Sequence, residues 1–168
     1  MTASFVLLSD ETLAAPAASM TATVDTAYRM FRVTFFGIKD GTPGYGIIRL
    51  NSDSGNNYIY QRISANDTAV AGVRGSANAA LRPMSAFDIA ANGTQMWTCE
   101  IEKPLASTPA RATSSGSIFG DLATDAICYE SATNEWANTA DLIDEITVLA
   151  SAGNFAIGTR MLIEGAKP

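Results

Sequence analysis

The sequence predicts an all-β protein, an antiparallel β-sandwich of jelly-roll type with about eight short strands. Apolar and polar residues alternate with a period of two, as at Phe31, Val33 and Phe35, which is typical of half-buried strands. β-branched and aromatic residues concentrate in such segments. Clusters of Gly, Asn, Asp, Ser and Pro separate them, as turns do.

Eight segments have strand character: residues 28–36, 45–50, 58–64, 95–102, 113–119, 126–131, 145–150 and 160–164. Turn signals lie between them, at residues 39–44, 51–57, 91–94 and 152–154. The alternation predicts that the inward side chains are Phe31, Val33, Phe35, Ile48, Leu50, Trp97, Ile146 and Val148. The one helical signal, at residues 10–18, is short and contains Pro16.

The 168 residues suit one domain with a core of its own. Residues 28–168 hold the strong strand pattern and are the expected sandwich domain. Residues 1–27 form a weakly patterned N-terminal segment that is either a first strand or an extended arm. Its apolar run of Phe5, Val6, Leu7 and Leu8 would pack in the sandwich in the first case, and on a neighbouring subunit or shell in the second.

The charge balance argues against nucleic acid and membrane as partners. The net charge is −6, and there is no cluster of Lys and Arg to contact phosphates. No apolar run approaches the roughly 20 residues that cross a bilayer, and the N-terminus lacks signal-peptide character. Only 17% of residues are charged. Such a surface is well suited to contact with protein, because little charge must be desolvated.

The chain contains no histidine, which removes the commonest general base and transition-metal ligand. Carboxylates remain as acid–base groups, with Asp141, Asp144 and Glu145 clustered and Glu100 and Glu102 alternating. A carboxylate pair can hydrolyse glycosides. Turn capping explains the first cluster as well, however, so we expect no enzyme and no catalytic residue.

Residues 51–55 resemble the first half of a calcium loop, with oxygen-bearing side chains on alternate positions before a glycine. The second half is absent, since Arg62 stands where an EF-hand has its bidentate glutamate. An Asx turn explains the same residues and is favoured. We therefore expect no metal and no cofactor. Cys99 and Cys128 lie in apolar, strand-like surroundings and are expected to be buried, reduced thiols.

Tyr45, Tyr58 and Tyr60, with Arg49 and Arg62, are candidates for an exposed aromatic and basic patch. Such a patch binds protein or carbohydrate, because Tyr and Arg contribute strongly at interfaces. Ordinary cross-strand pairing on the outer face of a sheet is the alternative.

Residues 49–58 fit an R-x-N-x-D-x-x-x-x-Y hairpin, and residues 137–148 and 153–165 fit a terminal hairpin that opens on a Gly-Thr step and ends in Gly. The order of these three motifs resembles that of small virion proteins of tailed bacteriophages. The resemblance covers roughly residues 28–165. It implies a jelly-roll-like sandwich and a place on the particle, as head decoration, head fibre or tail appendage.

The expected function is that of a capsid decoration or cement protein, which binds and stabilises the head shell from the particle surface after synthesis in the bacterial cytoplasm. Its partners would be the major capsid protein or other virion proteins, and it would be a homo-oligomer, a trimer by preference. The alternative is a receptor-binding module of a tail or head fibre. Tyr45, Tyr58, Tyr60 and Trp136 would then be the platforms for a cell-surface glycan.

Overall fold

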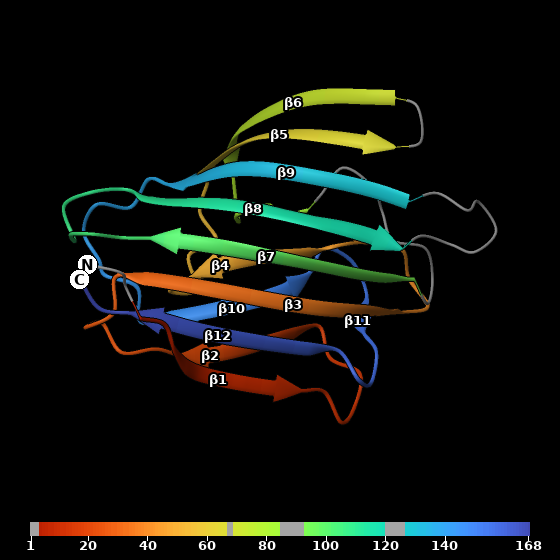
Figure 1. Cartoon of the computed structure of the whole chain (residues 1–168), viewed down its shortest axis with the longest axis horizontal. Helices are drawn as coiled ribbons and strands as arrows, with labels where there is room; N and C mark the ends of the chain where they lie inside the picture. The colour runs from red at the N-terminus through yellow and green to blue at the C-terminus, as the bar shows by residue number, and fades with distance from the viewer. Residues whose placement is uncertain (1–3, 67–68, 85–92, 120–126) are drawn as a thin grey trace.

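A computed structural model describes residues 4–66, 69–84, 93–119 and 127–168, and all the regular structure of these residues is β (Figure 1). The twelve strands are β1 (Val6–Thr12), β2 (Ser19–Thr23), β3 (Met30–Asp40), β4 (Gly46–Leu50), β5 (Tyr58–Asn66), β6 (Ala69–Asn78), β7 (Thr94–Glu102), β8 (Ala110–Phe119), β9 (Ile127–Trp136), β10 (Glu145–Ala150), β11 (Asn154–Phe155) and β12 (Arg160–Ala166). The described residues contain no helix, and so none that is long and apolar enough to cross a membrane.

The strands form two antiparallel sheets of unequal size, and the predicted β-sandwich is confirmed. The large sheet has nine strands in the order β1-β12-β3-β7-β8-β9-β5-β6, with β11 paired to β3. The small sheet has the order β2-β10-β4. It lies behind β12, β3 and β7 in Figure 1, so that the sandwich is deepest at one half of the large sheet.

All eight predicted strands are present, and the structure adds β1, β2, β6 and β11. The short helical signal at residues 10–18 produces no helix, because the end of β1 and a bend occupy this segment. Residues 1–27 contribute β1 to the large sheet and β2 to the small one, as the first-strand interpretation of this segment expects. The expected turn at 91–94 lies partly outside the described residues, and so does residue 126, the first residue of the strand predicted at 126–131.

The core lies between the two sheets. All the side chains predicted to be inward are at most 1% exposed, which confirms the expected strand faces; they are Phe31, Val33, Phe35, Ile48, Leu50, Trp97, Ile146 and Val148. The Phe35 ring stacks on Trp97 at a centroid distance of 5.0 Å and meets the edge of Phe155 at 5.1 Å. All three rings belong to strands of the large sheet, β3, β7 and β11, and contacts at this spacing stabilise its inner face beyond their contribution to burial.

A short segment completes the second layer where the small sheet ends. Residues 79–84, which we call the strap, cross the inner face of β8 and β9, and Leu81 exchanges backbone hydrogen bonds with Ile48 of β4. Leu81 and Met84 are buried. The Ser114 hydroxyl donates to the strap carbonyl of Pro83 at 2.9 Å. The strap thus covers apolar surface that three strands cannot reach.

Two glycines in strands make matched variants that test this packing. A Cβ at Gly116 would lie 2.4 Å from Met84 Sδ and 2.5 Å from the Met96 carbonyl oxygen. We expect Gly116→Ala to lower the free energy of unfolding by about 1–3 kcal/mol, as overpacked cores do. Gly72→Ala, whose Cβ would meet nothing closer than 3.9 Å, should change it by less than about 0.5 kcal/mol. Urea titrations measure both, and equal effects would contradict the packing described.

Candidate functional site

The segment that resembled half of a calcium loop is a tight turn between β4 and β5. Asn51 and Ser52 have left-handed backbones, with φ of 52° and 54°. The Asp53 carboxylate accepts hydrogen bonds from the Gly55 N–H at 2.8 Å and from the Asn57 amide at 2.9 Å. The oxygens that a cation would need are thus bonded within the turn, as an Asx turn requires. Arg62 lies on β5 and takes no part in this turn.

Asp53 also anchors a buried aromatic pair. Trp136 Nε1 donates to Asp53 Oδ2 at 2.7 Å, and the Trp136 ring stacks on Tyr58 at 6.4 Å. The Tyr58 hydroxyl accepts from the Leu50 N–H at 3.2 Å, and burial raises its pKa. Both aromatic side chains are 0% exposed. The expectation that Tyr58 and Trp136 form surface platforms is therefore wrong.

The other two predicted aromatic residues lie beside Arg82, which the sequence did not single out. Arg82 Nη1 donates to the Tyr45 hydroxyl at 2.9 Å, and the guanidinium lies 5.3 Å from the Tyr60 ring centroid. Tyr45 is half-buried and Tyr60 is buried. Arg62 also contacts Tyr60, at 5.7 Å. The Arg82 contacts hold the strap to Tyr45, which precedes β4, and to Tyr60 of β5, so the exposed patch expected here is not formed.

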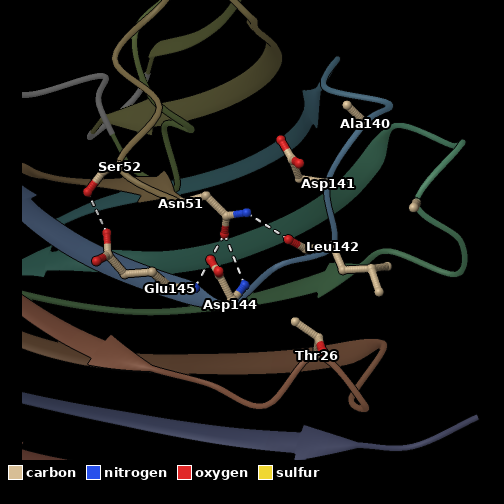
Figure 2. A pocket seen from close by; sticks show the side chains of 9 residues that line it. Thr26, Asn51, Ser52, Ala140, Asp141, Leu142, Asp144 and Glu145 are labelled. Carbon is tan, nitrogen blue, oxygen red and sulfur yellow. Dashed lines mark hydrogen bonds between the residues drawn. The ribbon is translucent and has the colours of Figure 1, made fainter.

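A shallow polar hollow lies next to the turn (Figure 2). The Asn51 side chain organises it by donating to the Leu142 carbonyl at 2.6 Å and accepting from the Asp144 N–H at 3.0 Å. Ser52 donates to Glu145 at 2.6 Å. Asp141 lines the same hollow. The predicted acidic cluster is therefore real, but no three acidic side chains among the described residues converge on a common point.

The other carboxylates considered for catalysis are not among the residues that line this hollow. Glu100 and Glu102 are on β7, and Glu100 accepts from Arg32 of β3 at 2.8 Å. The two predicted acidic sets therefore belong to different surfaces and do not form a pair.

Cys99 and Cys128 are free and buried, as expected. Burial, with Glu100 nearby, raises the pKa of the Cys99 thiol to about 12, and burial also raises that of Cys128. A thiol with a raised pKa carries little thiolate and is a poor nucleophile.

The N-terminal apolar run lies at the edge of the large sheet. Leu8 packs against the core, whereas Val6 and Leu7 are exposed. The Phe5 ring lies 4.2 Å from the Arg32 guanidinium. Two of these four predicted partner-binding residues thus remain available at the surface.

The broadest exposed feature is the outer face of the large sheet, the face opposite the small sheet. Directly paired residues of antiparallel strands point to the same face. One such row crosses six strands and consists of Phe36, Met96, Ser117, Tyr129, Ala65 and Val70. Phe36, Met96, Tyr129 and Val70 are 41%, 48%, 50% and 74% exposed. We call these six residues the apolar row.

The next row along the strands carries hydroxyl groups. Thr34 pairs with Thr98, and the row continues through Ser115 and Ser131 to Ile63. These short side chains leave a shallow hollow in the face, lined by Thr98, Ser115 and Ser131 of this row together with Tyr129. Ile63 is 60% exposed and extends the apolar row at the β5 end.

The charged groups on this face are compensated by one another. Arg32 lies 2.8 Å from Glu100 and 3.6 Å from Glu164. Arg160 makes two hydrogen bonds with Asp10, at 2.9 and 2.7 Å. These contacts lower the pKa of Asp10 and raise that of Arg160. The face is therefore close to neutral although the chain carries a net charge of −6.

Comparison with known proteins found no matching family model, curated protein or solved structure.

Trp136→Phe tests the buried corner at Asp53. Burial opposes the Asp53 charge, but the hydrogen bonds from Trp136, Asn57 and Gly55 outweigh it and lower the pKa. The loss of one hydrogen bond to a charged acceptor costs about 2 kcal/mol. We therefore expect Trp136→Phe to lower the free energy of unfolding by that amount at pH 7. The pKa of an aspartate in the unfolded chain is about 3.9. Because the pKa of Asp53 is lower in the folded state, its charge stabilises the fold above about pH 3.9, and this stabilisation is lost as the pH falls through the folded-state pKa.

The difference between the wild type and Trp136→Phe should therefore shrink below about pH 4. In the Asp53→Asn background, the Trp136→Phe difference should vary little over the same pH range. Thermal melts followed by circular dichroism measure this. A difference that stays constant down to pH 2 would show that the carboxylate is not the partner that matters.

Proposed function

We propose that this chain is a non-enzymatic structural protein of a tailed-phage particle, a decoration or cement protein of the head. The observation that supports it most is the outer face of the large sheet. This face is broad and close to neutral, and the apolar row crosses it. A neutral face with exposed apolar groups is the kind of surface that buries against protein at little desolvation cost. The sequence resemblance to small virion proteins is the second support.

A cement protein binds neighbouring capsid subunits many times over. Each contact can be modest, because repetition over the shell supplies avidity. The outer face suits such contacts, since its Ser and Thr side chains offer hydrogen bonds while the apolar row supplies buried area. The partners in this proposal are the major capsid protein or other virion proteins, and the chain acts as a homo-oligomer on the particle surface.

The alternative of a glycan-recognising module has lost its main structural support. Two of its four expected platforms, Tyr58 and Trp136, lie in the core. Tyr129 is a large aromatic side chain exposed on the outer face. It lies between Ser117 and Ala65 in its row, without a second aromatic ring directly paired to it.

Copy number in purified particles tests the proposed role. Quantitative mass spectrometry of virions from the phage that carries the gene should find hundreds of copies for each particle. A few to a few dozen copies would support a fibre or tail component instead. Absence of the chain from intact particles would contradict a virion role altogether.

Two matched charge variants test the face. We expect Met96→Glu to reduce binding to particles that lack the protein by at least tenfold, because the partner would have to desolvate a charge. Leu105→Glu adds the same charge at a residue that is 60% exposed in the loop between β7 and β8, and should bind normally. Co-sedimentation measures both, with circular dichroism as the check on folding. Equal binding by the two variants would show that the outer face does not contact the particle.

A further inference from the structure

The large sheet is open at both ends. In Figure 1, β6 is the uppermost strand and β1 the lowest, and among the described strands each pairs on one side only. β6 is ten residues long and has one charged residue, Arg74. Val70 is 74% exposed and Val73 is 39% exposed, and they point to opposite faces. A long edge strand with few charges is a template for pairing with another chain unless something covers it.

The opposite edge strand, β1, is acidic where β6 is basic. β1 carries Asp10 and Glu11, and its Val6 and Leu7 are exposed. Its direction also fits. Each strand of the path from β1 to β6 is antiparallel to the next. Eight strands in this order leave the two edge strands opposite in direction. A second copy placed beside the first in the same orientation therefore offers β1 antiparallel to β6.

We propose that β6 of one copy pairs with β1 of the next, so that the large sheets of neighbouring copies join edge to edge. The inference rests on the oligomer of the proposed function and names its interface. Such a contact is heterologous, and a heterologous contact closes into a ring when the rotation between copies permits. Closure leaves no free edge, whereas pairing of β6 with itself would leave every β1 exposed.

The register of the sheet predicts which residues of β6 and β1 lie opposite one another in this contact. The apolar row ends at Val70 on β6, and its continuation through Phe36 and Arg160 ends at Thr12 on β1. If the row continues between copies, Thr12 lies opposite Val70. Asp10 then lies opposite Gly72, which has no side chain to obstruct it, and diagonal to Arg74. Diagonal neighbours on one face of a sheet are within reach of a long side chain, so Arg74 meets the acidic edge of its neighbour.

Blocking β6 should abolish the oligomer without affecting the fold. Lysine on an edge strand prevents pairing because its charge must remain hydrated. We expect the double variant Val70→Lys and Val73→Lys to be monomeric by light scattering under conditions where the wild type is oligomeric. Ile63→Lys is the matched control, since Ile63 is 60% exposed but lies on β5, one strand from the edge. It should leave the oligomer intact.

Cysteine trapping identifies the partner strand. A protein with Thr12→Cys and a protein with Val70→Cys are mixed, allowed to exchange subunits and oxidised. The mixture should give a disulfide-linked dimer, and each protein alone should give none, because Cys99 and Cys128 are buried. A dimer formed by the Val70→Cys protein alone would pair β6 with itself and overturn the proposal. A wild type that is monomeric at all concentrations would overturn it too.

These measurements use the isolated protein, whereas the particle count tests the role in the virion. The failure of one is therefore distinguishable from the failure of the other.

Discussion

One constraint shapes the whole molecule: a sheet of nine strands has only three strands to cover its inner face. The small sheet reaches β12, β3 and β7, where Phe35, Trp97 and Phe155 fill the space between the layers. Beyond β7 the strap covers the large sheet, and its own Leu81 and Met84 are buried against it. Long polar side chains complete the cover. The small sheet and the strap both cover the inner face of the large sheet, and so its outer face remains exposed.

The buried charges show how the loops are fixed to this layer. Lys103 is 1% exposed, and its ammonium group donates to the carbonyls of Thr108 and Asn138 at 2.5 and 2.6 Å. It also lies 5.3 Å from the Trp136 ring. Burial lowers its pKa. A buried ammonium is tolerated only when such partners replace its water. Lys39 plays a similar part, donating to the Ala152 carbonyl and lying against Phe155.

Sequence periodicity was sufficient for the longer strands that bury one face, since their alternation follows directly from that burial, but it missed the five-residue β2, which also buries alternate side chains. It failed at β6, because both faces of that strand are largely exposed and Ala, Gly and Ser leave no pattern. It also misassigned the faces of β5. Ile59 and Ile63 are the more apolar residues, yet Tyr58 and Tyr60 point inward. The Tyr58 hydroxyl bonds backbone groups of the turn, and this long-range requirement cannot be deduced from local composition.

The distribution of charge connects the open face to the open edges. The acidic excess lies mainly in loops, as at Asp141 and Asp144, while the outer-face charges are paired within the sheet. Pairing of this kind makes the face neutral without making it apolar, which keeps a broad exposed surface soluble. The same sheet ends in one edge with a single basic residue and one with two acidic residues. Edge-to-edge pairing would join the neutral faces of neighbouring copies into one continuous surface. Because a repeated lattice is contacted best by a repeated surface, the edges and the face then serve a single purpose.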